Sequence, residues 1–312
     1  MESRKTPQRF SSSSRKGRQP VDQKKPRTPK EKLVAFLKEV FYVGGAFLIL
    51  NSFVLASFEV PTGSMEDTVM PGDFLFVNKF IFGGTTPRTI PLTNVRIPHV
   101  SLPKLRQVHK GDVIVFVWPG MPNEIRPLEP TYYLKRCVAE PGDTIQIVNK
   151  VVFVNGIRQP LPKYAKFDRP YIIPRGVRDS RIFPPGSDYN EDNYGPLWVP
   201  KKGGTIKITP ANLEQWRIFI EREGHTVDVN NGLVTIDGKP TDRYTVERDY
   251  IFAMGDNRDN SLDSRFWGFV PVDDVVGTPM IVYWSWDPSI PIFDIITKLQ
   301  SIQWGRLGTI IN

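Results

Sequence analysis

Cysteine and histidine are scarce in this 312-residue chain, which contains only Cys137, His99, His109 and His225. A single cysteine cannot form an intramolecular disulfide, and the three histidines do not follow the spacing of a metal-ligating motif. We therefore expect no disulfide framework, no metal and no cofactor. Because Cys137 lies within an apolar run, we interpret it as a buried packing residue rather than a thiol nucleophile.

A net positive charge is also missing from most of the chain, although the formal net charge of the whole is +8. Residues 1–38 hold 12 Lys or Arg against three acidic residues, a balance of +9, so the other 274 residues carry −1. The basic segment is rich in Ser, Pro and Gln and has little apolar surface to bury. We expect residues 1–38 to form a disordered cytoplasmic arm, and no nucleic-acid partner is needed to explain the charge.

Long apolar runs are limited to one, Val40 to Phe58, in which 19 residues carry no charge. A helix of this length spans roughly 28 Å, about the thickness of the hydrocarbon core of a bilayer. We expect residues 39–58 to form a single transmembrane anchor. The positive-inside rule places the basic arm in the cytoplasm and the rest of the chain beyond the cytoplasmic membrane. A buried core helix and a cleaved signal sequence remain the alternatives.

Helical periodicity is rare after residue 58, where Ala211 to Glu223 is the best helix candidate. Short β-type runs separated by Gly and Pro predominate, and no regular alternation of strands and helices is present to build a parallel sheet. The predicted fold class is therefore mainly β, with an antiparallel catalytic sheet after the transmembrane helix. The expected parts are a catalytic domain (59–157 and 241–288), an inserted accessory β-subdomain (158–240) and a C-terminal surface segment (289–312).

An internal similarity relates Gly142–Arg158 to Gly224–Pro240, which align without gaps and share five residues. Each copy is typical of a strand, a turn and a second strand, followed by Asn-Gly or Asp-Gly. Duplication and convergent hairpin chemistry both explain the similarity at this stage.

The first candidate for chemistry is Ser64, in the segment VPTGSMEDTVMPGDF. Rigid prolines around a Gly-Ser step indicate a fixed loop that presents a hydroxyl. The sequence has no G-x-S-x-G motif and no histidine in a recognisable partner context. If Ser64 is a nucleophile, another residue type must act as its base.

Lys135, in TYYLKRCVAEPGD, is a candidate for that base. The alternation of a strand places Tyr133, Lys135 and Cys137 on one face and Arg136 on the other. At its ordinary pKa only about one lysine in 2,500 is neutral at pH 7. Burial against apolar walls lowers the pKa of lysine. The hypothesis therefore requires a dry pocket around Lys135.

A third segment, MGDNRDNSLDSRFWGFVPVDDVVG at residues 254–277, is too polar at its start for a buried strand and predicts a loop that frames a site. Together with PTGSM, GDVIVFVWP and YYLKRCVAEPGD, it resembles the type I signal peptidases, the bacterial leader peptidases. The resemblance implies a Ser/Lys dyad serine endopeptidase that removes signal peptides from exported preproteins at the outer face of the cytoplasmic membrane.

The resemblance also implies roles for individual residues. Ser64 corresponds to the acylated nucleophile, Lys135 to the general base, and Thr62 with the Ser64 backbone N–H to the oxyanion hole. Ser261 corresponds to the residue that orients the lysine, and Asp263 and Arg265 to a supporting ion pair. The positions that would bind small substrate side chains at −1 and −3 are Phe58, Val60, Met65, Val115, Tyr133 and Leu134. Substrate backbone would pair with strand edges at 58–62 and 131–134.

Two features depart from the family pattern. Asp67 stands where the family usually has Pro, two residues after Met65. The chain also shows one anchor where two are usual. The first predicts an altered turn after Ser64, and the second changes only how the domain is tethered.

Three alternative functions can be distinguished. The S-x-x-K match at Ser101 to Lys104 lacks the other motifs of penicillin-binding enzymes. A self-cleaving repressor shares the dyad but requires a DNA-binding module and a cytoplasmic address. A membrane-tethered β-scaffold that binds extended peptides would not require the Ser64 hydroxyl.

Overall fold

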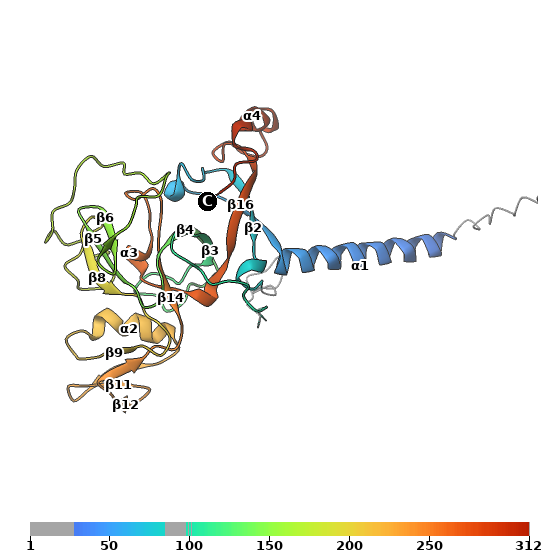
Figure 1. Cartoon of the computed structure of the whole chain (residues 1–312). Helices are drawn as coiled ribbons and strands as arrows, with labels where there is room; N and C mark the ends of the chain where they lie inside the picture. Colours follow the sequence, from blue (N-terminus) through green and yellow to red (C-terminus); the bar gives the residue numbers. More distant parts are fainter. Residues whose placement is uncertain (1–27, 85–97, 99, 101, 312) are drawn as a thin grey trace, which may run out of the picture. The chain divides into compact units, whose positions relative to one another are not determined.

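The computed structural model describes residues 28–84, 98, 100 and 102–311. The chain divides into two compact units, residues 1–46 and residues 47–312. Most of the predicted basic arm and Ser101 of the S-x-x-K match lie outside the described residues. The first unit contains most of helix α1 (Pro29–Phe53), and the second contains all the strands of Figure 1.

Helix α1 begins earlier than predicted, within the segment assigned to the basic arm. The Thr28 backbone N–H donates to Glu31 Oε2 over 2.8 Å, and the Glu31 N–H donates to Thr28 Oγ1 over 3.3 Å. This reciprocal pattern is a capping box, and Pro29 occupies the first helical position that proline favours. The expectation that the arm extends to residue 38 is therefore wrong for residues 29–38.

Helix α1 also ends earlier than the predicted anchor. It stops at Phe53, and Leu55–Glu59 form strand β1, which pairs antiparallel with β2 (Asp73–Asn78). The 19-residue apolar run is thus divided between a helix and a half-buried strand. The 25-residue helix is long and apolar enough to cross a membrane, and its most apolar window is not buried in the structure. The helix therefore ends at Phe53, five residues before the predicted end of the anchor at residue 58.

The main sheet of the described chain has seven strands in the order β1-β2-β16-β3-β4-β14-β15. Its further members are β3 (Val113–Val117), β4 (Tyr132–Ala139), β14 (Tyr250–Met254), β15 (Val270–Pro271) and β16 (Val275–Ser285). All pairings are antiparallel, which confirms the predicted mainly β fold class.

Both faces of this sheet are buried at β3. Val113 and Val115 pack in one apolar cluster, whereas Ile114 and Phe116 pack in another. This continuous burial follows from the alternation of side chains along a strand between two cores. It gives β4, the neighbour of β3, a dry setting.

The remaining strands form three smaller sheets. One has the order β7-β6-β5-β8 and the others the orders β10-β11-β12 and β13-β9. The bounds are β5 (Thr144–Val148), β6 (Val151–Val154), β7 (Ile157–Arg158), β8 (Tyr194–Trp198), β9 (Thr205–Lys207), β10 (Val227–Asn230), β11 (Leu233–Ile236), β12 (Lys239–Pro240) and β13 (Arg243–Thr245). Helix α2 (Leu213–Arg222) confirms the predicted helix, and it lies near β9, β11 and β12 in Figure 1.

The predicted boundary at residue 158 passes through one of these sheets. Strand β5, assigned to the catalytic domain, pairs with β8 of the accessory part. A single apolar cluster contains Ile145 from β5, Leu197 from β8 and Phe252 from β14. The accessory part therefore shares its core with the catalytic sheet and does not fold around a separate one.

The two similar segments adopt the same local structure. Each forms a hairpin, β5-β6 or β10-β11, followed by a turn and a short third strand. The side chains of Asn155 and Asp237 accept hydrogen bonds from the N–H groups of Thr144 and Thr226 at equivalent places. The sequence similarity thus encodes the same turn chemistry twice.

Helix α3 (Ser264–Trp267) precedes β15. The C-terminal segment 289–312 contains α4 (Ile295–Gln300), which follows β16, and a 3₁₀ turn at Trp304–Arg306. Beyond α4 the chain returns to β16, where the Ile311 N–H donates to the Met280 carbonyl over 3.0 Å. The predicted surface segment is therefore held to the sheet at its end.

Candidate active site

Ser64 lies in a single 3₁₀ turn, Gly63–Met65, that follows β1. The turn is fixed from both ends, because Met65 is buried and the Val60 N–H donates to the Asp73 carbonyl on β2 over 2.9 Å. The Ser64 carbonyl accepts from the Asn257 N–H over 3.1 Å. The sequence MPGDF supports this turn through Gly72, whose φ of 86° and contact with the Trp286 carbonyl leave no room for a Cβ.

Lys135 lies on β4, and its Nζ donates to Ser64 Oγ over 2.6 Å. The side chains of Tyr133 and Lys135 share one face of the strand, and the Lys135 Nζ is 5.6 Å from the centre of the Tyr133 ring. Trp118 stacks on Tyr133 at 5.4 Å between ring centres, and Trp267 contacts it edge-on. These aromatic rings form an apolar surface beside the Lys135 amine, as the hypothesis of a lysine base requires.

Burial lowers the pKa of Lys135 to about 8, because only 3% of the residue is exposed. The carboxylates of Asp263 and Asp256 oppose this effect, and Arg265 adds to it. At a pKa of 8 about one lysine in ten is neutral at pH 7. The arrangement thus supplies an amine that can accept a proton from the Ser64 hydroxyl.

Cys137, next on the same strand face, has the opposite character. Its exposed fraction is 1%, and burial raises the pKa of its thiol far above the ordinary value. A thiol in this state is inert as a nucleophile. The interpretation of Cys137 as a packing residue is confirmed.

The loop 255–265 lies directly against Ser64. A Cβ on Gly255 would stand 2.2 Å from Ser261 Oγ and 2.5 Å from the Ser64 carbonyl oxygen, so only glycine permits this approach. Ser261 is buried, and its Oγ forms no hydrogen bond within the described residues. Its expected role in orienting Lys135 stays a prediction.

Asp263 and Arg265 form a buried ion pair with distances of 2.9 and 2.8 Å. Asp263 also accepts from the Gly255 N–H and caps helix α3. Burial works to raise the pKa of Asp263, but Arg265 and these hydrogen bonds hold it below its ordinary value. The pair therefore fixes the loop under Lys135 while staying charged.

The Thr62 hydroxyl lies beside the dyad, with 3.5 Å between its Oγ1 and Ser64 Oγ. Its side chain is exposed and its backbone is extended. A hydroxyl in this place can donate to an oxygen that develops charge beside Ser64.

The predicted substrate-binding residues fall into two groups. Five of them pack in one apolar cluster: Phe58, Val60, Met65, Val115 and Leu134. Tyr133 is not in that cluster and instead packs with Trp118 and Trp267 on the Lys135 face of β4. The rings of Phe58 and Tyr132 meet at 5.2 Å, which brings the edges of β1 and β4 together.

The backbone conformation of Asp67 accounts for the absence of the proline that the family pattern has at this position. Its φ is 71°, a left-handed conformation that Asp tolerates and that the ring of Pro forbids. Next to it, Glu66 forms an ion pair with Lys166 of the accessory part, with 2.9 Å between Lys166 Nζ and Glu66 Oε2. The turn after Ser64 is thus held by the accessory part.

Two charged residues beside the site were not assigned from the sequence. Arg136 donates to both carboxylate oxygens of Asp256, over 2.9 and 2.7 Å, and both residues are buried. Asp256 also accepts from Thr68 Oγ1 over 2.5 Å. The sequence indicates this pair only through Arg136, a charged residue within a strand whose neighbouring positions are buried.

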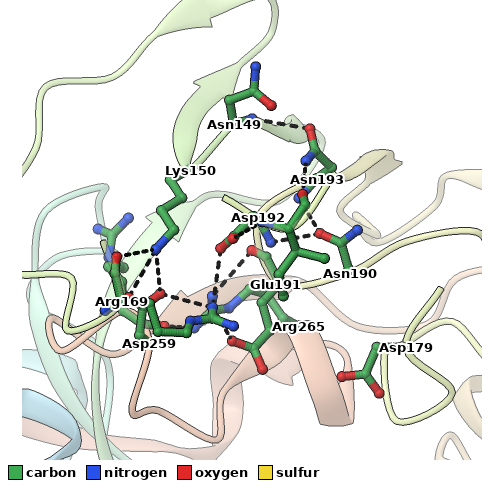
Figure 2. A network of polar contacts seen from close by, with 12 residues as sticks. Asn149, Lys150, Arg169, Asp179, Asn190, Glu191, Asp192, Asn193, Asp259 and Arg265 are labelled. Atoms are coloured by element: carbon green, nitrogen blue, oxygen red, sulfur yellow. Dashed lines mark hydrogen bonds and ion pairs between the residues drawn. The ribbon is translucent and has the colours of Figure 1, made fainter. Parts of the chain in front are cut away.

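A second ionic network ties the accessory part to the loop 255–265. Figure 2 shows Lys150 and Arg169 converging on Asp259, at distances of 3.0 and 2.9 Å. Arg169 also pairs with Glu191 over 2.7 Å and with Asp192 over 3.3 Å. Ion pairs therefore connect the turn between β5 and β6, the 158–193 segment and the site loop.

Comparisons with known proteins identify the family of the chain. A family model described as signal peptidase, peptidase S26, matches residues 33–284. Signal peptidase I of Pseudomonas aeruginosa is 29% identical over 269 residues, which cover 83% of this chain and 75% of that protein. Signal peptidase I of Buchnera aphidicola subsp. Schizaphis graminum is 30% identical over 248 residues, covering 77% and 71%.

One solved structure is also similar, the crystal structure of a signal peptidase I from Enterococcus faecalis V583. It is 19% identical, covers 55% of this chain and 97% of that chain, and has a TM-score of 0.26. This score is too low to support an argument about the fold. The sequence matches carry the comparison, and every residue of the candidate site lies within 33–284.

Proposed function

We propose a catalytic mechanism from one premise: the chain belongs to the peptidase S26 family of signal peptidases and is a serine endopeptidase that removes signal peptides from preproteins. In this mechanism Ser64 is the nucleophile and Lys135 is the general base. The observation that carries the proposal is the 2.6 Å contact between Lys135 Nζ and Ser64 Oγ, in a pocket that leaves the lysine 3% exposed.

The proposed reaction begins with the neutral amine of Lys135. Lys135 accepts the Ser64 proton as Oγ attacks the carbonyl carbon of the scissile bond, which gives a tetrahedral oxyanion. The protonated amine then donates that proton to the departing amine of the mature protein, and the acyl-enzyme remains on Ser64. Lys135 then accepts a proton from water as the water oxygen attacks the ester carbon. It returns this proton to Ser64 Oγ as the ester bond breaks and the signal peptide leaves with a free carboxylate.

The supporting residues have proposed roles that follow from their contacts. Asp263 and Arg265 hold the loop that carries Gly255, and Ser261 orients the lysine amine. The cluster at the edges of β1 and β4 receives the small −1 and −3 side chains of the substrate, whose backbone pairs with those edges. The residues proposed to form this surface are Phe58, Val60, Met65, Val115, Tyr133 and Leu134.

Thr62 is proposed to donate to the oxyanion together with the Ser64 N–H. We expect Thr62→Val to lower kcat by about 10²-fold with little change in KM, because the donor acts only when charge develops. Steady-state kinetics on a preprotein or a signal-peptide substrate measure this split, and Thr62→Ser is the matched control that keeps the hydroxyl. A rise in KM with unchanged kcat would assign Thr62 to substrate binding instead.

The proposed location is the cytoplasmic membrane, with α1 as a single span, the N-terminus in the cytoplasm and the catalytic part on the outer side. The charge of residues 1–38 and the length of α1 support this orientation. In right-side-out vesicles, added protease is expected to degrade residues after 59 and to spare the N-terminal arm. Protection of the catalytic part would reverse the orientation.

The experiment that tests the function is cleavage of a purified preprotein by the full-length protein in a neutral detergent. The cut is expected at a single site after small residues at −1 and −3, as read by mass spectrometry of the products. The family match favours this activity over a self-cleaving repressor. A peptide-binding scaffold would leave the preprotein intact.

A further inference from the structure

A cavity of about 760 Å³ is lined by residues that include Arg136 of β4 and Arg258 of the loop 255–265. Its wall comes from β4, the turn between β5 and β6, residues 158–169 of the accessory part, Arg258 and Ile310. The proposed peptidase mechanism does not use this cavity. Cavities of roughly 300–1,000 Å³ are of the size that holds small organic ligands.

The wall of the cavity carries positive charge, and none of the described residues that line it is Asp or Glu. Its basic residues are Lys110, Arg136, Lys150, Arg158, Lys163, Arg169 and Arg258. Three of them form ion pairs with carboxylates that do not line the cavity. Lys150 and Arg169 pair with Asp259, as Figure 2 shows, and Arg136 pairs with Asp256. These pairs fix the wall, so they do not themselves call for a ligand.

Arg258 differs from its neighbours. It is 3% exposed, its Nε is fully buried, and its side chain forms no hydrogen bond or ion pair within the described residues. Burial lowers the pKa of Arg258 to about 10, so it is charged at neutral pH. A buried cation without a partner is costly, and structures rarely retain one that nothing neutralises.

The local balance of charge explains why the described residues do not neutralise Arg258. Arg136 and Arg265 disfavour its charge, and the two carboxylates that favour it, Asp256 and Asp263, are already paired with those arginines. The surplus positive charge lies in the wall of the cavity. A guanidinium in this state is suited to phosphate or carboxylate oxygens.

Part of the lining of the cavity is apolar. The apolar residues include Val151, Pro160, Leu161, Tyr164 and Phe167. A small inorganic anion would leave this surface uncovered, whereas a molecule with an apolar chain would cover it.

We propose that this cavity binds an anionic amphiphile, a molecule with one phosphate or carboxylate group on an apolar chain, and that Arg258 holds its head group. An acidic phospholipid and a fatty acid share this chemistry. The binding is independent of peptide cleavage. It lies close to the active site, because Arg258 follows Asn257, whose N–H donates to the Ser64 carbonyl over 3.1 Å.

The test is isothermal titration of the full-length protein in a neutral detergent, without substrate. The probes are dihexanoylphosphatidylglycerol, octanoate, dihexanoylphosphatidylcholine and inorganic phosphate. At least one of the first two is expected to bind at least tenfold more tightly than either of the last two. If dihexanoylphosphatidylglycerol binds more tightly than octanoate, the ligand is an acidic phospholipid. If octanoate binds more tightly, the ligand is a fatty acid. Equal binding of inorganic phosphate or of the phosphatidylcholine would overturn the proposal.

Two variants locate the site. Arg258→Gln is expected to weaken binding at least tenfold and to leave the thermal midpoint unchanged or higher, since it removes an unpaired buried cation. Leu161→Asp, at a 52% exposed position of the apolar wall, is expected to weaken binding similarly, whereas Leu233→Asp, 60% exposed on β11, is not. Should Arg258→Gln not fold, Leu161→Asp decides alone, and unchanged binding in that variant contradicts the proposal.

Discussion

Purified protein carrying Ser64→Ala is expected to cleave a preprotein at least about 10⁴-fold more slowly than the wild type, and Lys135→Met to lose as much. The two residues act as one unit across 2.6 Å, so the double variant is expected to be no slower than either single variant. Single-turnover rates by gel or mass spectrometry measure these losses. Additive losses in the double variant would mean that the residues act in separate steps.

The variant Lys135→Arg separates the role of a base from the role of a positive charge at this position. Arginine keeps the charge and the length of the side chain, but it stays protonated at every working pH and cannot act as a base. We expect the variant to be as inactive as Lys135→Met. Cys137→Ser, on the same strand face, is the matched control and is expected to retain activity. Substantial cleavage by Lys135→Arg would show that a positive charge at this position is sufficient.

The second large effect is expected from the buried pair of Arg136 and Asp256. Asp256→Asn leaves the Arg136 guanidinium without its partner carboxylate and weakens the contact with Thr68. Breaking a buried pair from one side costs about 3–5 kcal/mol. For a domain of this size that corresponds to a fall in thermal midpoint of roughly 10 °C, measured by tryptophan fluorescence.

The control for this prediction is an exposed pair. Arg243 and Asp242 lie on the surface, with side-chain exposures of 69% and 73%. Arg243→Gln is expected to leave the midpoint unchanged, because solvent screens such pairs. If Asp256→Asn melted at the same temperature as Arg243→Gln, the buried pair would have no part in holding the loop against Ser64.

The secondary structure was largely predictable where the pattern is local. The runs at Asp73–Asn78, Val113–Val117 and Tyr132–Ala139 are strands as predicted, and the helix at 211–223 is α2. The same local signals also explain the errors. The capping box at Thr28 starts the helix inside a segment whose charge and composition indicate disorder. Residues 55–58 are apolar enough for either a helix or a half-buried strand, and their pairing with β2 makes them a strand.

The candidate site was predictable because its motifs are contiguous. The alternation along β4 placed Lys135 and Tyr133 on one face, which is their arrangement in the structure. By contrast, the partner of Arg136 lies 120 residues away, and the unpaired state of Arg258 depends on the whole loop and the accessory part. The pairing of these two arginines depends on the tertiary structure, so no local pattern in a single sequence reveals it.

The most direct test of the central claim, that a neutral Lys135 activates Ser64, is the pH dependence of kcat/KM between pH 5.5 and 10. Burial lowers the folded-state pKa of Lys135 to about 8, so the active neutral form is depleted below pH 8 and predominates above it. We predict that kcat/KM rises about tenfold per pH unit on the acid side and levels off above pH 8. A midpoint near 6.5, typical of a histidine base, or a rate independent of pH would contradict the account.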